Sequence, residues 1–139
     1  MKKFNIILFI VFNLSLAGHS YPTRDEIFEE LIKQDILYPD IVLKQAKLET
    51  NYGKSGVGRY KNNLFGFRKT NRYINFKHWK ESVNYYKKWQ EKKIKEYIKE
   101  KGYLLDYYDF ICWSGWKDGK KYSTKGKKYI EYLKKIKIN

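Results

Sequence analysis

The sequence predicts one mainly α-helical domain with a small extended or β arm. Three observations indicate this class. Apolar residues recur at helical spacing through most of the chain after residue 23. Residues that start and stop helices frame these stretches: Thr23 and Glu26 match a capping box, and Gly102 follows the longest apolar face. Between residues 51 and 71 the chain is rich in Gly, Asn, Lys and Ser, which is typical of a loop.

The helices follow in order from these signals. They are expected at residues 24–35, 39–50, 80–101, 103–113 and 124–136. Pro39 suits a first helical turn, Gly53 lies just beyond the second helix, and Ser123 or Thr124 caps the last one. The core-facing positions that the spacing predicts include Ile27, Leu31, Ile41, Val42, Val83, Tyr86, Trp89, Ile94, Tyr97, Ile98, Tyr129, Ile130, Leu133 and Ile136.

The segment between the second and third of these helices is expected to be mostly loop. One helical turn is expected near residues 62–65. Residues 72–76 are expected to form a short strand or an extended arm, because Tyr73, Ile74 and Phe76 favour β structure.

The first twenty residues have the pattern of an export signal. Lys2 and Lys3 supply positive charge, residues 4–14 are mostly apolar, and small residues follow. We expect a signal peptide at 1–20 and a catalytic domain at 21–139, located in the periplasm, at the cell surface or outside the cell. An uncleaved anchor is the weaker interpretation, because the apolar run is shorter than the ~20 residues of a membrane span. No later stretch is apolar enough to span a bilayer.

The charge and the cysteine count narrow the function classes. The formal charge is +15, and removal of the two lysines of the signal leaves +13, which favours anionic partners. The lysines are spread along the whole chain and no zinc-finger, basic-zipper or RNA-recognition signature occurs, so no specific nucleic-acid site is expected. Cys112 is the only cysteine and is expected to be a small buried residue. His78 alone remains after the signal, so no metal site and no cofactor are expected, and a Cys112–His78 peptidase has no supporting motif. We expect a monomer.

Glu49 is the candidate catalytic residue, at the end of an apolar helix and before a loop. Cleavage of an acetal link requires a proton on the leaving oxygen, and a carboxyl group near apolar side chains keeps its proton closer to neutral pH. Leu48, Tyr52 and Phe65 are expected to provide these surroundings. An exposed surface glutamate is the competing interpretation, and periodicity alone favours it.

Two motifs favour a catalytic Glu49 over an exposed surface glutamate. The first is Ala46-x-x-Glu49-Thr50-x-Tyr52-Gly53-x-Ser55 and the second is Asn62-Asn63-Leu64-Phe65-Gly66. Together they resemble the bacterial glucosaminidase domain family, peptidoglycan hydrolases with a lysozyme-like helical fold. The likeness continues through Tyr73-x-x-Phe76-x-x-Trp79-x-Glu81-Ser82-Val83, Trp89-Gln90 and Tyr122-Ser123. It spans roughly residues 22 to 136.

The resemblance implies an exported hydrolase that cleaves β-N-acetylglucosaminyl links of peptidoglycan glycan strands. Glu49 matches the general acid of the family, and Tyr122 matches a tyrosine that faces this acid. Aromatic side chains also suit sugar rings, whose C–H faces stack on aromatic planes. The expected substrate-binding residues are Tyr52, Asn63, Phe65, Gly66, Tyr73 and Trp79.

The arm departs from the family pattern. Some members carry a second acid there, but residues 67–80 contain no Asp or Glu. Glycoside hydrolysis usually uses two carboxylates, or else the acetamido group of the substrate assists. Candidate second acids outside the arm are Glu81, Asp106, Asp109 and Asp118, and Glu81 also suits a helix N-terminus. A catalytically weak glycan-binding module of the same fold and a cell-wall amidase therefore stay open as alternatives.

Overall fold

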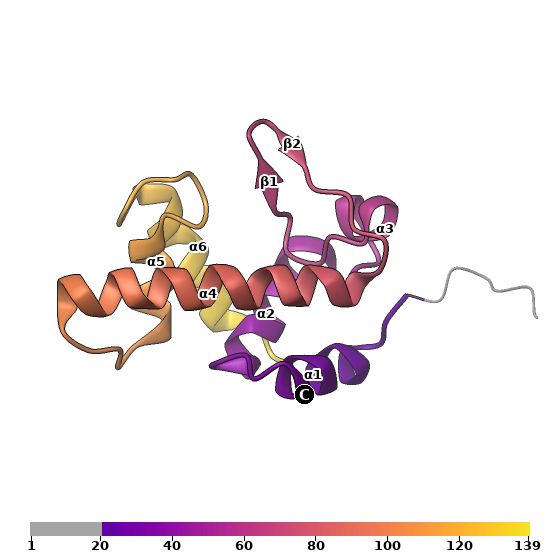
Figure 1. The fold of residues 1–139 in the computed structure, drawn as a ribbon, viewed down its shortest axis with the longest axis horizontal. Coiled ribbons are helices and arrows are strands. Elements are labelled where there is room, and N and C mark those ends of the chain that lie inside the picture. Colours follow the sequence, from indigo (N-terminus) through magenta and orange to yellow (C-terminus); the bar gives the residue numbers. More distant parts are fainter. Residues whose placement is uncertain (1–20) are drawn as a thin grey trace, which may run out of the picture.

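The computed structural model describes residues 21–139 as a helical domain with one small hairpin (Figure 1). Within these residues the elements are α1 (Arg24–Lys33), α2 (Pro39–Thr50), α3 (Gly56–Lys61), β1 (Arg68–Lys69), β2 (Arg72–Tyr73), α4 (Trp79–Lys101), α5 (Tyr107–Ser114) and α6 (Thr124–Lys135). The prediction of a mainly α domain with a small β arm is confirmed, and the arrangement agrees with a lysozyme-like helical class. The predicted signal peptide lies outside the described residues. No helix from residue 21 onward is long and apolar enough to cross a membrane.

Local signals explain where several of these helices begin and end. The capping box at α1 is present, with the Thr23 hydroxyl accepting from the Glu26 amide and the Glu26 carboxylate accepting from the Thr23 amide. Ser123 caps α6 by accepting from the Gly126 amide. Gly102 ends α4 with φ of 88°, a left-handed conformation that glycine adopts at little cost.

The loop region between α2 and α4 differs from the prediction in one respect. The helical segment lies at Gly56–Lys61 rather than near residues 62–65, because Asn62 adopts a left-handed conformation that ends α3. The arm is a hairpin in which Arg68 pairs with Tyr73 and Lys69 with Arg72, so β2 covers only the start of the expected strand. The predicted helix at 103–113 also begins later, at Tyr107, because Asp106 accepts hydrogen bonds from the amides of Tyr108 and Asp109.

The core lies between α1, α2, α4, α5 and α6. Most positions predicted to be buried are so, and Cys112 is buried as expected. Ile98 is an exception, with 42 % of its surface exposed, and Leu48, the expected apolar neighbour of Glu49, has 37 % of its surface exposed. A buried polar chain crosses the core: Tyr86 donates to Gln45, Tyr86 and Tyr107 share a hydrogen bond, and Gln90 donates to Tyr107. These bonds tie α2, α4 and α5 together beneath the end of α2 that carries Glu49.

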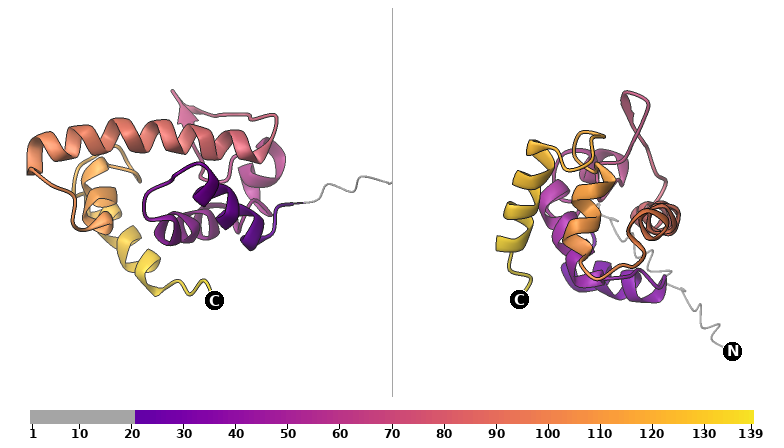
Figure 2. Two further views of the ribbon diagram at one scale, coloured as in Figure 1. Left: turned by 60° about the horizontal axis from the view of Figure 1, so that its bottom comes forward. Right: turned by 90° about the vertical axis from the view of Figure 1, so that its left-hand side faces the viewer.

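The arm and the loop between α5 and α6 rise on the same side of α4 (Figure 1). The view along α4 in Figure 2 shows the same relation, with α6 on the outer side of α5. The C-terminal tail returns to the opposite side, where the carbonyl oxygens of Ile138 and Lys137 accept from Arg24 and Lys47. Residues of the arm, the end of α2 and the α5–α6 loop all line one cavity.

Candidate active site

A cavity of about 750 Å³ occupies the space between the arm, the end of α2, α4 and the α5–α6 loop. Glu49 lines it from α2, Tyr85 and Trp89 from α4, and Trp116 from the loop. The arm and the turn before it contribute Phe65, Gly66, Phe67, Arg68, Thr70 and Tyr73. Segments far apart in the sequence thus meet around one carboxylate.

The two sequence motifs meet through Thr50. Its hydroxyl donates to the Leu64 carbonyl over 2.8 Å and accepts from the Gly53 amide over 3.0 Å. Asn51 turns the chain in a left-handed conformation directly after α2. The side chain that follows Glu49 in sequence therefore fixes the Leu64–Gly66 turn against the end of α2.

Gly66 lets the backbone of this turn approach the acid closely. Its φ is 70°, which disfavours other residues, and a Cβ atom there would lie 3.6 Å from Glu49 Oε2. The glycine of the second motif thus forms the wall directly beside Glu49.

Asn63 holds the base of the arm. It is fully buried, its Nδ2 donates to the carbonyls of Phe67 and Ile74 over 2.9 and 3.0 Å, and its Oδ1 accepts from the Phe67 amide over 2.9 Å. These three bonds join the two sides of the hairpin where it leaves the core.

The α5–α6 loop covers one oxygen of Glu49. Trp116 Nε1 donates to Glu49 Oε1 over 3.1 Å, and Lys117 Nζ lies 3.7 Å from the same oxygen. The Glu49 side chain keeps only 15 % of its surface exposed. Oε1 is thereby engaged by the loop, whereas Oε2 faces Gly66.

Tyr129 on α6 is buried beside Glu49. Burial, and then the negative charge of Glu49, raise the pKa of the Tyr129 phenol well above its usual value. Lys117 Nζ also lies 5.2 Å from the centre of the Tyr129 ring. A protonated phenol therefore stands beneath the acid at every physiological pH.

Asp118 is a second carboxylate on the wall of this cavity. Its Oδ1 accepts from the Ser123 hydroxyl over 2.8 Å and from the Lys120 amide over 3.1 Å. The Ser123 hydrogen bond is the main reason that the pKa of Asp118 is lowered. An anionic carboxylate and Glu49 thus line the same cavity.

Comparison with known proteins identifies the family of the chain. The sequence model of the Glucosaminidase family, described as mannosyl-glycoprotein endo-beta-N-acetylglucosaminidase, matches residues 25–137. The chain belongs to this family. Its membership supports a glycoside hydrolase acting on peptidoglycan-related glycans. No curated protein and no solved structure matches the chain significantly.

This glucosaminidase domain brings four of the predicted site residues together. Glu49, Phe65, Gly66 and Tyr73 all line the cavity. The other predicted binding residues do not line it: Tyr52 lies in the core, Asn63 is buried beneath the arm, and Trp79 begins α4. Leu48 is half-exposed, so Phe65 is the member of the three apolar neighbours expected for Glu49 that lines the cavity.

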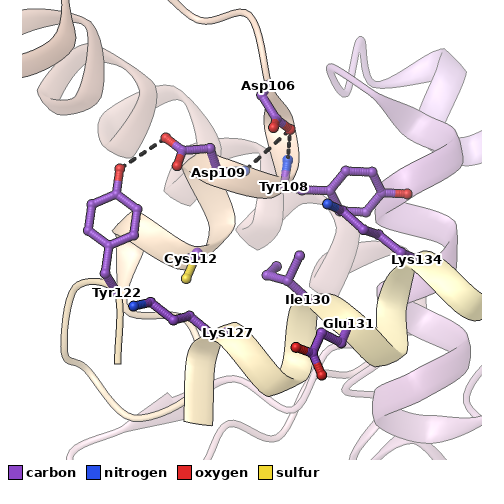
Figure 3. A pocket seen from close by; sticks show the side chains of 9 residues that line it. All are labelled: Asp106, Tyr108, Asp109, Cys112, Tyr122, Lys127, Ile130, Glu131 and Lys134. Atoms are coloured by element: carbon purple, nitrogen blue, oxygen red, sulfur yellow. Dashed lines mark hydrogen bonds between the residues drawn. The ribbon is translucent and has the colours of Figure 1, made fainter. Parts of the chain in front are cut away.

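The expectation that Tyr122 faces Glu49 needs correction. The Tyr122 amide donates to the Cys112 carbonyl, and its hydroxyl donates to Asp109 Oδ2 over 3.0 Å (Figure 3). Tyr122 and Cys112 line a separate cavity of about 310 Å³ between α5 and α6. Burial, and then the hydrogen bond to Asp109, raise the pKa of Tyr122 to about 12, and burial raises the pKa of the Cys112 thiol. Tyr129 is the tyrosine that the glucosaminidase fold brings to Glu49.

His78 and the remaining acids serve other roles. His78 caps α4 by accepting from the Lys80 amide, and Glu81 accepts from the Lys77 amide, as expected of a charge at a helix N-terminus. Asp106 and Asp109 line the Cys112 cavity instead. Among residues 21–139, no three His, Cys, Asp or Glu side chains lie together as a metal site.

The sequence motifs did not identify the contacts made by Lys117, Tyr129 and Arg68. Trp116 follows Trp113 by three positions, but Trp113 is buried in the core whereas Trp116 lines the cavity. The contact of Trp116 with Glu49 spans 67 positions of sequence. No local pattern contains such a contact, so only the packed fold reveals it.

Proposed function

We propose that this domain is an exported peptidoglycan hydrolase that cleaves β-N-acetylglucosaminyl links of the glycan strand. The observation that carries the proposal is the position of Glu49, which lines a cavity of about 750 Å³ with one oxygen held by Trp116. Family membership over residues 25–137 supports the glycosidase class. The pattern of residues 1–20 supports export, to the periplasm, the cell surface or the medium.

Glu49 acts as the general acid. Trp116 and Lys117 engage Oε1, so Oε2, on the side of Gly66, is the oxygen that delivers the proton. The bond between C1 and the glycosidic oxygen breaks as that oxygen is protonated, and positive charge develops at C1. Water then adds to C1 and gives up a proton, either to Glu49, which restores the acid directly, or to Asp118, after which proton exchange with solvent restores both carboxyl groups.

Asp118 supplies the second carboxylate. The arm has no acid, and among the four candidates outside the arm Asp118 is the one that lines the Glu49 cavity. Its lowered pKa keeps it anionic, as stabilisation of charge at C1 or activation of water requires. A glycan-binding module without turnover would need neither carboxylate in this arrangement.

The sugar at each new reducing end identifies the bond that is cleaved. Purified peptidoglycan is digested, the products are reduced with borohydride, and mass spectrometry identifies the reduced sugar. We expect N-acetylglucosaminitol at the new ends. Reduced muramic acid would indicate cleavage of the other glycosidic link, and free peptides without new reducing ends would indicate an amidase. Binding without any product would favour the glycan-binding alternative.

A further inference from the structure

Arg68 is a cation on the cavity wall without an acidic partner in the described part of the chain. It lies in β1, is exposed, and lines the same cavity as Glu49. Within residues 21–139 no carboxylate lies within ion-pair distance of its guanidinium group. The arm itself contains no Asp or Glu. An arginine in a glycan cleft therefore keeps its charge available.

Tyr73 orients this guanidinium group. The group lies 4.2 Å from the centre of the Tyr73 ring, and Nη2 donates to Tyr73 Oη. The two residues are register partners in the hairpin, so their side chains are adjacent by construction. The Tyr73 ring stacks on the face of the guanidinium group. N–H groups at the edge of the guanidinium group therefore stay available to donate to the two oxygens of a carboxylate.

The other charged groups on the cavity wall are engaged within the protein. Lys117 faces Glu49, and Asp118 accepts from Ser123 and Lys120. Arg68 is the charged side chain of the wall that has only an aromatic partner. Tyr73 holds the Arg68 side chain in place before an anion binds, so less conformational entropy is lost on binding.

We propose that Arg68, oriented by Tyr73, binds a carboxylate of the substrate and selects carboxylate-bearing glycan strands over uncharged N-acetylglucosamine polymers. This inference rests on the function proposed for the site. In peptidoglycan the carboxylate has two sources, the lactyl group of a peptide-free sugar and the peptide attached to that group. Both present the same planar anion to the guanidinium group.

The test measures binding in a variant that is not expected to cleave the ligands. In the Glu49→Gln protein, calorimetry measures the Kd of peptide-free glycan fragments, peptide-bearing fragments and chitooligosaccharides, with and without Arg68→Gln. We expect Arg68→Gln to weaken binding of at least one carboxylate-bearing ligand about tenfold, which corresponds to one charge-assisted hydrogen-bonded contact. Binding of chitooligosaccharides should change less than about twofold. The ligand that loses affinity identifies the source of the carboxylate.

Two variants make the result specific. Arg72→Gln removes an arginine from the same hairpin that does not line the cavity, and it should leave all affinities unchanged. Arg68→Lys keeps the charge without the planar fork and should recover only part of the affinity. Equal losses for charged and uncharged ligands, no loss for either, or no measurable binding of carboxylate-bearing fragments would overturn the inference. Cleavage of peptidoglycan by the unsubstituted protein tests the proposed function independently, because the binding comparison in the Glu49→Gln protein needs no turnover.

Discussion

Trp116 Nε1 donates a hydrogen bond to Glu49 Oε1 over 3.1 Å, from a loop 67 positions further along the chain. Trp116 also packs edge-to-face on Trp89 and Phe67, with ring centres 4.8 and 5.3 Å apart. The aromatic cluster fixes the indole, and the indole fixes the carboxylate. The acid is therefore oriented by tertiary packing rather than by the helix that carries it.

Replacement of Trp116 by phenylalanine tests this orientation. Trp116→Phe keeps an aromatic ring but removes the N–H donor, and loss of a hydrogen bond to a charged group costs about 1.5–3 kcal/mol. We expect kcat on peptidoglycan fragments to fall about tenfold or more. Trp113→Phe is the matched control, because Trp113 Nε1 donates to Glu100 outside the cavity. That variant should lose stability but keep its kcat, and an equal loss of kcat in both would contradict the assignment.

The second carboxylate makes a separate prediction. Asp118→Asn keeps the size of the side chain but removes the charge, and we expect turnover to fall about 100-fold. Asp109→Asn, in the other cavity, should leave turnover unchanged apart from any loss of folded protein. Nuclear magnetic resonance of the first product anomer then distinguishes activation of water from direct stabilisation at C1. Full activity of Asp118→Asn would instead favour assistance by the acetamido group of the substrate.

Much of the fold follows from local signals. The capping box at Thr23, the cap at Ser123 and the stop at Gly102 placed three helix ends correctly. The arm was expected from its β-favouring residues, and the pairing of Arg68 with Tyr73 bears this out. These features depend on neighbouring residues, so a single sequence contains enough information to predict them.

The partners of the acid depend on distant residues and were not predicted from local patterns. Tyr122 matches a family motif in sequence. Its backbone amide nevertheless donates a hydrogen bond to the Cys112 carbonyl, and its hydroxyl donates to Asp109 rather than facing Glu49. Tyr129 reaches Glu49 only because α6 packs against α2. Helical spacing predicted that Tyr129 is buried, but not which group it is buried against.

Asn63 should control the position of the arm. Asn63→Ala removes three hydrogen bonds and leaves polar groups at the base of the hairpin without partners, at about 1–3 kcal/mol for each buried group. We expect a lower melting temperature by circular dichroism and a loss of activity in the protein that stays folded. Asn63→Asp keeps the acceptor for the Phe67 amide but places an oxygen against the carbonyls of Phe67 and Ile74 in a fully buried site, so it should be at least as harmful. A stable, fully active Asn63→Ala protein would show that the arm does not depend on these bonds.

The buried tyrosines predict an alkaline transition. Desolvation raises the pKa of Tyr52, Tyr86, Tyr97, Tyr107, Tyr122 and Tyr129 above their usual value of about 10. A raised pKa in the folded state gives stability that is complete below pH 10 and is lost as pH rises through the folded values, about 12 for Tyr122. Ultraviolet titration should show that these six phenols ionise only above pH 10 and together with unfolding. A single transition near pH 10 in the folded protein would contradict this burial.

The central claim is that Glu49 is the acid, and one comparison tests it most directly. Glu49→Gln keeps the shape of the side chain but cannot deliver the proton, whereas Glu29→Gln makes the same chemical change on the exposed face of α1. Circular dichroism first establishes that both variants are folded. The release of new reducing ends from peptidoglycan is then compared with that of the unsubstituted protein. We expect Glu49→Gln to lose about 100-fold or more of the rate and Glu29→Gln to retain it. An undiminished rate in folded Glu49→Gln protein would contradict the account.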